Sequence, residues 1–141
     1  MALDDDVGRA LILVVDDDAA IRSVLVDVLE SEGYATDTAD NGVEALRRIE
    51  ATPPALVLLD LRMPVRTGVE LLHDLRERGL WPGIPVVPMS AGLTLVAQLT
   101  REFGTLAAGP FLQKPFDLDD LLCIVASFVE PPRTPTASSV S

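Results

Sequence analysis

Three short segments, far apart in the chain, each consist of an apolar run that stops abruptly at charged residues. The first two runs end in acids, at Asp16, Asp17 and Asp18 and at Asp60, and the third ends at Lys114. Such runs are typical of strands buried on both faces of a parallel sheet. Because ligands of these sheets bind beyond the carboxyl ends of the strands, we expect these charged side chains to lie together in one site.

Lys114 is the only lysine in the chain, since the other ten of its eleven basic residues are arginines. A lysine ammonium is a compact point charge, whereas the guanidinium group is a flat fork of donors. The carboxylates at the other two strand ends would repel one another and raise each other's pKa unless a cation joined them. The pattern therefore predicts a pocket for a divalent metal ion and a phosphoryl group.

Apolar runs alternate along the chain with segments of helical periodicity. Strands are expected at residues 10–15, 34–39, 55–59, 84–89 and 110–113. Helices are expected at residues 19–32, between Gly42 and Pro53, and at 69–78, 93–103 and 117–129. Five strands alternating with five helices predict an α/β fold, a doubly wound parallel sheet covered on both faces.

The length of 141 residues fits one domain. We expect this domain at residues 10–130, after a flexible segment at 1–9 and before a disordered Pro/Thr/Ser-rich tail at 131–141. A net charge of −11 argues against direct contact with nucleic acid or an anionic membrane surface. No apolar stretch approaches the roughly 20 residues that span a bilayer. Cys123, expected in the core, is the single cysteine, which excludes an internal disulfide and favours a cytoplasmic location.

Residues from about 10 to 129 resemble the receiver domain of bacterial two-component response regulators. The resemblance rests on the paired acids after the first run, Asp-Leu-Arg-Met-Pro from Asp60, the following Gly68, Ser90-Ala91 thirty residues after Asp60, and Lys114-Pro115-Phe116. These motifs occur in the order of the family, and together they are highly specific. The resemblance implies a flavodoxin-like receiver fold with strand order 2-1-3-4-5.

The resemblance also implies that Asp60 accepts a phosphoryl group from a histidine kinase or a histidine phosphotransfer protein. Mg²⁺, with Mn²⁺ as an expected substitute, would be held by Asp17, Asp60 and the backbone carbonyl of Arg62, and by Asp16 through water. Ser90 would donate a hydrogen bond to the phosphoryl group, and Lys114 would pair with it. Catalysis would be limited to the phosphorylation and dephosphorylation of the protein itself.

Further roles follow from the same resemblance. Ser90 and Phe111 would form the switch that alters the surface made by residues 93–103, 110–113 and 117–129. That surface would bind a downstream protein, and a homodimer through it is an open alternative. The Lys114–Pro115 peptide bond is expected to be cis.

Arg62 and Gly92 stand where the family tunes phosphoryl lifetime. Neither side chain offers a carboxylate or carboxamide to orient an attacking water. We therefore expect slow to moderate self-dephosphorylation.

Two alternatives stay open. A pseudo-receiver would use the same fold as an interaction module that phosphorylation does not switch. Pro88 favours it, because a proline inside the fourth strand removes a hydrogen-bond donor and usually marks a bulge or an edge. An aspartyl phosphatase would use the Asp-x-Asp spacing of Asp16 and Asp18, but it leaves Asp60 without a role. His73 is expected on a solvated helix face.

Overall fold

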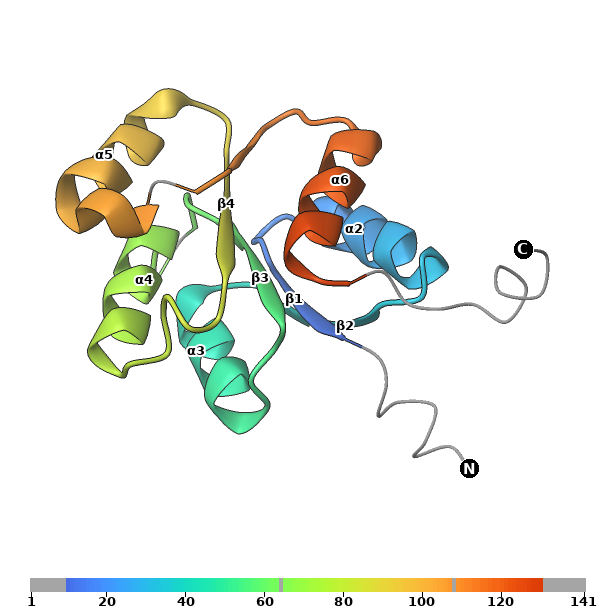
Figure 1. The fold of residues 1–141 in the computed structure, drawn as a ribbon, viewed down its shortest axis with the longest axis horizontal. Helices are drawn as coiled ribbons and strands as arrows, with labels where there is room; N and C mark the ends of the chain where they lie inside the picture. The colour runs from blue at the N-terminus through green and yellow to red at the C-terminus, as the bar shows by residue number, and fades with distance from the viewer. Residues whose placement is uncertain (1–9, 64, 108, 131–141) are drawn as a thin grey trace.

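A computed structural model describes residues 10–63, 65–107 and 109–130. The segments 1–9 and 131–141, predicted above to be flexible and disordered, lie outside the described residues. The described residues form one sheet with helices on both of its faces (Figure 1).

All neighbouring strands of the sheet are parallel, and their order is β2-β1-β3-β4-β5. The strands are β1 (Leu11–Val15), β2 (Ala35–Ala39), β3 (Leu56–Asp60), β4 (Val86–Ser90) and β5 (Leu112–Gln113). The helices are α2 (Ala19–Ser31), α3 (Gly42–Ala51), α4 (Gly68–Glu77), α5 (Leu93–Phe103), the 3₁₀ turn η1 (Gly104–Ala107) and α6 (Leu118–Phe128). The predicted α/β fold, its strand order and its five helices are confirmed.

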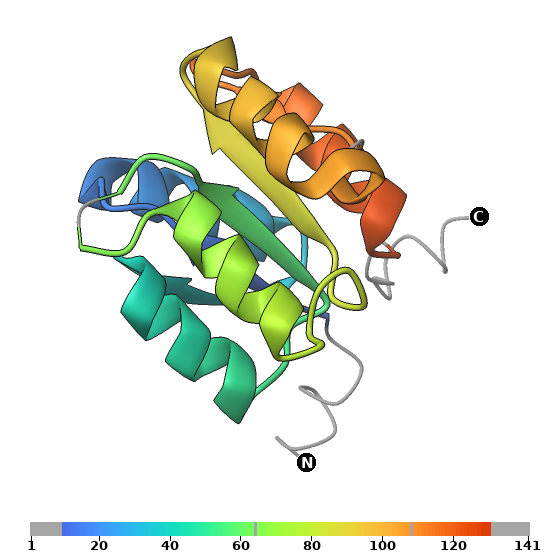
Figure 2. The same ribbon diagram turned by 90° about the vertical axis from the view of Figure 1, so that its left-hand side faces the viewer.

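The two faces of the sheet carry separate apolar cores. Helices α2 and α6 cover one face, and α3, α4 and α5 cover the other (Figures 1 and 2). Successive residues of β1 alternate between the cores, with Ile12 and Val14 on the α2 side and Leu13 and Val15 on the other. Double burial therefore explains why the inner strands β1 and β3 are continuous apolar runs up to their ends. No helix in the described ranges is long and apolar enough to cross a membrane.

Pro88 lies inside β4, yet the pairing of β3 with β4 runs unbroken through it. The backbone N–H of Lys114 donates to the Ser90 carbonyl at 2.7 Å, so alternate residues of β4, including Pro88, face β5. Strand β5 begins only at Leu112, beyond the level of Pro88. The missing donor therefore faces a position where β5 has not begun. The expected bulge does not occur, since no residue interrupts the pairing of β3 with β4. Strand β5 is shorter than the predicted 110–113.

The loop between β3 and α4 passes unusually close to the end of β3 at Gly68. A Cβ atom on Gly68 would lie 2.5 Å from the carbonyl oxygen of Asp60 and 2.7 Å from Leu61 Cα. Such contacts are too short for any other residue, so glycine is required here. Gly68 also donates its N–H to the Leu61 carbonyl at 3.2 Å. The glycine thus allows the loop to fold back tightly beside Asp60.

Of two further side chains with predicted surroundings, Cys123 and His73, only the cysteine differs from its prediction. Cys123 is exposed on α6, not part of the core. Its position faces away from the buried Leu121 and Val125, which form the apolar stripe of that helix. His73 keeps 44% of its side chain exposed, in agreement with the predicted solvated face, while its ring lies 4.5 Å from that of Phe103 and its Nε2 lies 2.5 Å from Oε1 of Glu102.

Candidate functional site

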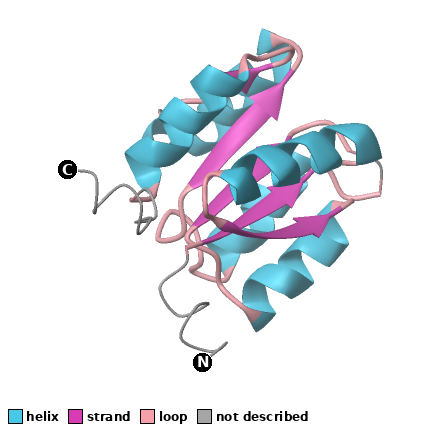
Figure 3. Ribbon diagram, turned by 90° about the vertical axis from the view of Figure 1, so that its right-hand side faces the viewer, coloured by secondary structure: helices cyan, strands magenta, loops and turns pink. Residues whose placement is uncertain are grey.

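The carboxyl ends of the strands meet at one edge of the sheet (Figure 3). A cavity of about 510 Å³ opens at this edge. Its lining includes the predicted site residues Asp16, Asp17, Asp60, Arg62, Ser90, Gly92 and Lys114. Four strand ends contribute to it, so the parallel topology assembles a site from segments up to 98 positions apart.

Asp16 directly follows β1 and is fully buried. One of its carboxylate oxygens, Oδ1, accepts the N–H of Asp18 at 3.0 Å, and the other, Oδ2, lies 2.6 Å from Nζ of Lys114. Its own N–H donates to the carbonyl of Ala39 at 3.2 Å. A buried carboxylate needs such partners, because desolvating an unpaired charge is costly. Asp16 is therefore anchored by the protein on both of its carboxylate oxygens.

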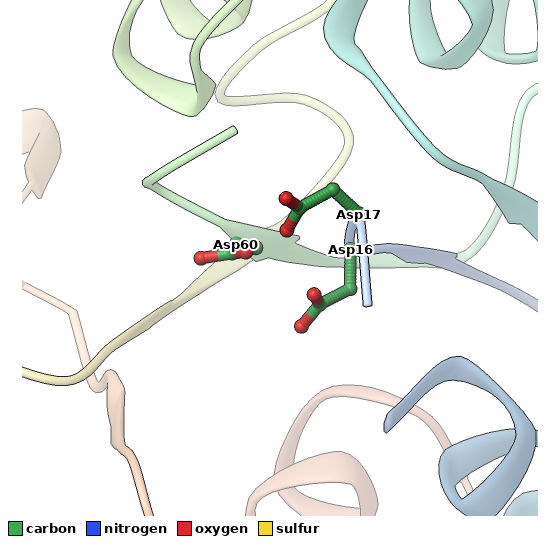
Figure 4. Close-up of side chains that lie close together, drawn as sticks. All are labelled: Asp16, Asp17 and Asp60. Carbon is green, nitrogen blue, oxygen red and sulfur yellow. The ribbon is translucent and has the colours of Figure 1, made fainter. Parts of the chain in front are cut away.

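Asp17 and Asp60 come from adjacent strands and, with Asp16, form an acidic cluster (Figure 4). One oxygen from each of these three carboxylates lies within 4.8 Å of the other two. Asp17 is exposed, whereas Asp16 and Asp60 are buried. Mg²⁺ prefers hard oxygen ligands and usually keeps several waters beside one or two carboxylates. The exposed acid beside two buried ones fits this pattern of ligands.

Burial is the largest cause that raises the pKa of Asp60, from its ordinary 3.8 to about 6. The N–H of Arg62, which donates to Asp60 Oδ1 at 3.1 Å, opposes this shift, and the negative charge of Asp16 adds to it. Repulsion between the acids, which the sequence predicts as the cause, has a smaller effect than burial. A cation in the cavity would favour the ionised form of Asp60.

Lys114 lies directly after β5 and is mostly buried, with 18% of its side chain exposed. Its ammonium is 2.6 Å from Asp16 and 3.5 Å from Asp60 Oδ2. The ammonium therefore lies between the two buried acids and balances part of their charge. The Lys114–Pro115 peptide bond is cis.

Ser90 is the last residue of β4 and is buried beside the cavity. Its hydroxyl donates to the carbonyl of Gly92 at 2.8 Å, and Oγ lies within 3.3 Å of the Gly92 N–H. Gly92 is the N-cap of α5 and makes no side-chain cap hydrogen bond. The hydroxyl of Ser90 is therefore bound to the start of α5 and must leave the Gly92 carbonyl to donate elsewhere.

Phe111 does not line the acidic cavity. It is half-buried just before β5 and borders a separate groove of about 540 Å³ along the segment 111–117 and α6. The structure thus brings together the predicted acids, the hydroxyl and the ammonium, and leaves the predicted aromatic switch outside their cavity.

Asp18 caps the helix that begins beside the site. Its carboxylate accepts the N–H groups of Ala20 and Ile21 at 2.9 and 3.2 Å. An N-cap bond of this kind satisfies donors that a helix leaves free in its first turn. This carboxylate is therefore engaged at the start of α2, although the residue borders the cavity.

Several residues at this edge were not predicted from the sequence. Thr94 and Leu95, from the first turn of α5, line the cavity. Arg22 of α2 donates from Nη1 to the backbone carbonyl of Asp16 at 2.7 Å. No motif marks these residues, because only the direction in which α2 and α5 leave the strand ends brings them to the site.

A family model described as the response regulator receiver domain matches residues 12–126. The chain therefore belongs to the response regulator receiver domain family. Sporulation initiation phosphotransferase F of Bacillus subtilis is 37% identical over 119 residues, which are 84% of this chain and 92% of that protein. DNA-binding transcriptional regulator NtrC of Escherichia coli is 36% identical over 117 residues, covering 83% of this chain and 24% of NtrC. The chain thus spans about a quarter of the length of NtrC.

Solved structures show the same fold. Chemotaxis response regulator CheY4 of Vibrio cholerae superposes with a TM-score of 0.75 at 27% identity, over 86% of this chain and 99% of that chain. The receiver domain of sensor histidine kinase PA1611 from Pseudomonas aeruginosa superposes with a TM-score of 0.72 at 28% identity, over 85% and 97%. The PA1611 structure has a magnesium ion coordinated in its active site cleft.

Proposed function

We propose that Asp60 accepts a phosphoryl group from the phosphohistidine of a histidine kinase or a histidine phosphotransfer protein. The observation that carries this proposal is the cavity in which Asp60 lies with the ammonium of Lys114 and the hydroxyl of Ser90. One carboxylate oxygen of Asp60 attacks phosphorus, and the P–N bond breaks as the electron pair returns to the imidazole. Lys114 and Ser90 then offer a positive charge and a donor to the phosphoryl oxygens.

The acidic cluster would hold Mg²⁺ through Asp17, Asp60 and the Arg62 carbonyl, with Asp16 acting through water. The spacing of the three carboxylates and the magnesium ion in the related PA1611 domain support this assignment. When bound, Mg²⁺ supplies positive charge that offsets the charge on the transferring phosphoryl group. Mn²⁺ takes similar oxygen ligands and is the expected substitute.

The switch would begin at Ser90. To donate to a phosphoryl oxygen, its hydroxyl must give up the bond to the Gly92 carbonyl, which would free the start of α5. Phe111, which lies just before β5, would then change position. The surface of α5, β5 and α6 would bind a downstream protein, and a homodimer through the same surface stays an alternative. The cytoplasmic location inferred from the single cysteine also stays a prediction.

Arg62 and Gly92 border the cavity without offering a carboxylate or carboxamide. No group of this kind would orient a water toward the phosphoryl group from these two positions. We therefore expect the phosphorylated protein to dephosphorylate itself slowly to moderately. A lifetime of only seconds in the isolated protein would contradict this expectation.

The two alternatives have less structural support. The argument for a pseudo-receiver was Pro88, but β4 keeps its register through Pro88 and Ser90 still lines the cavity. The argument for a phosphatase needed Asp18 as an acid, but its carboxylate caps α2. We expect no turnover of a chromogenic phosphate ester, so that the protein acts only on its own phosphoryl group.

Intact mass spectrometry after incubation with acetyl phosphate tests the proposal. Wild-type protein with Mg²⁺ is expected to gain one phosphoryl group, and chelation of the metal is expected to prevent this gain. Asp60→Asn is expected to gain none under the same conditions. If the wild-type protein binds Mg²⁺ but gains no phosphoryl group, the proposal is wrong and the pseudo-receiver is favoured.

A further inference from the structure

Arg22, on α2, contacts the backbone of the acidic cluster. It lies four residues after the N-cap of α2 and is half-buried. Its Nη1 donates to the backbone carbonyl of Asp16 at 2.7 Å. Among the residues that the structure describes, no carboxylate lies within ion-pair distance of it. The guanidinium therefore binds the chain beside the acidic cluster and is not held by an acid.

The carbonyl that Arg22 holds belongs to the peptide unit joining Asp16 to Asp17. A peptide unit is planar, so fixing its oxygen also fixes the direction in which the chain enters the next residue. The other side of this junction is already anchored, because the buried Asp16 side chain is bound by Lys114 and by the N–H of Asp18. Arg22 adds the constraint on the backbone itself.

Asp17 depends on this constraint more than its neighbour does. Its side chain is exposed and makes no hydrogen bond to the part of the chain that the structure describes. The backbone on either side of Asp17 therefore sets the position of its Cβ, and with it the space that the carboxylate can reach. Without the Arg22 bond, the carbonyl of the Asp16–Asp17 peptide unit would lose the partner that fixes its direction, and the Asp17 carboxylate would lie near Asp60 less often.

We propose that Arg22 is a positioning residue that holds the Asp16–Asp17 peptide so that the Asp17 carboxylate faces Asp60 and completes a divalent cation site. The inference rests on the proposed function, because it assumes that Asp17 and Asp60 bind Mg²⁺. Groups that orient the ligands of a metal typically change its affinity about 10–100-fold when they are removed.

Positioning and simple electrostatics predict opposite effects. The Arg22 guanidinium is a positive charge close to a cation site, so charge repulsion alone would make its removal tighten Mg²⁺ binding. Loss of a positioning hydrogen bond would weaken Mg²⁺ binding instead. A role confined to helix stability would lower the free energy of unfolding and leave the affinity of the folded protein unchanged. The sign of the change in affinity therefore separates the three explanations.

The test is isothermal titration calorimetry with MgCl₂ on the full chain, together with urea unfolding of each variant. Arg22→Met keeps an unbranched apolar stem and removes the donor and the charge. Arg47→Met is the matched control, because Arg47 lies exposed on α3 and pairs with Glu44. We expect Arg22→Met to weaken Mg²⁺ binding by about tenfold, and Arg47→Met to bind like wild type. Arg22→Lys keeps the charge and a donor, so its loss should be smaller.

Unchanged or tighter Mg²⁺ binding by folded Arg22→Met would overturn the inference. If Arg22→Met does not fold, the Mg²⁺ affinity of Arg22→Lys is the test. Weaker binding than in the wild type supports the proposal, and unchanged or tighter binding overturns it. Asp17→Asn separates this failure from that of the proposed function. Loss of binding in Asp17→Asn but not in Arg22→Met would refute only the role of Arg22, whereas a wild-type protein that binds no Mg²⁺ would refute both.

Discussion

The ammonium of Lys114 lies 2.6 Å from the buried carboxylate of Asp16, although the two residues are 98 positions apart. The same ammonium is 3.5 Å from Asp60. In this state Lys114 is therefore a counter-ion for the acids, and a phosphoryl group on Asp60 would offer it a second partner. Lys114 therefore contributes both to the folded structure of the site and to its proposed chemistry.

Replacing Lys114 by methionine is expected to destabilise the Mg²⁺-free protein by about 3 kcal/mol, because removal of one partner leaves a buried charge unpaired. Added Mg²⁺ should restore part of this loss by placing another cation near the acids. Urea unfolding with and without Mg²⁺ measures both effects. Arg78→Met is the control, since its pair with Glu50 is exposed and should contribute less than about 1 kcal/mol. Equal losses in the two variants would contradict the assigned role of Lys114.

The raised pKa of Asp60 predicts a pH-dependent stability in the absence of Mg²⁺. Because the pKa is about 6 in the folded protein against an ordinary 3.8, the native state binds this proton more tightly than the unfolded state. The stabilisation is present below about pH 4 and is lost as the pH rises through about 6. Asp60→Asn cannot ionise here, so above pH 6 it should be more stable than wild type by up to about 3 kcal/mol. A difference that does not vary with pH would show that this pKa is not raised.

Val65 is expected to strain the loop that follows Asp60. Its φ is 67°, a left-handed conformation that a β-branched residue rarely adopts, and its side chain is 82% exposed. Asparagine tolerates this conformation, so Val65→Asn should stabilise the protein by about 1 kcal/mol. Val24→Asn is the control, because Val24 is also exposed but lies in regular helix. Thermal and urea unfolding measure the stability of both variants. An equal change in the free energy of unfolding in the two would contradict the prediction.

Gly68→Ala is expected to destabilise the protein by about 2 kcal/mol or more, since the added Cβ would overlap the backbone at Asp60 and Leu61. The displaced loop should also slow phosphorylation by acetyl phosphate. Gly83→Ala is the matched control, because the nearest atom to its Cβ would be the Leu80 carbonyl oxygen at 3.7 Å. Stability and phosphorylation rate together test this account. A Gly68→Ala protein as stable as the Gly83→Ala protein would refute the close approach.

The fold was predictable because its signals are local and repeated. Each inner strand is a short apolar run, each long helix has an apolar stripe, and parallel pairing follows from their alternation. Strand β5 was less predictable. It begins only at Leu112, and Pro88 in the neighbouring strand lacks the donor that would face residues before it. A pattern read along one strand contains no information about such a partner.

The site was predictable where a residue lies at the end of a strand, as Asp60, Ser90 and Lys114 do. It was less predictable where a helix supplies the group, as for Arg22, because the direction of a helix depends on packing. Burial was also underestimated as the cause of the raised pKa of Asp60. The exposure of Cys123 was missed because the expectation followed the residue type, although its place two residues from Leu121 and from Val125 puts it on the other face of α6.

Locating the phosphoryl group decides whether Asp60 is the phosphoacceptor. Wild-type protein is treated with Mg²⁺ and acetyl phosphate and then with sodium borohydride, which reduces an aspartyl phosphate to homoserine, and its peptides are sequenced by mass spectrometry. We expect homoserine at position 60 alone, and none when the metal is chelated. Reduction at Asp16 or Asp17, or at no position in a protein that binds Mg²⁺, would contradict it.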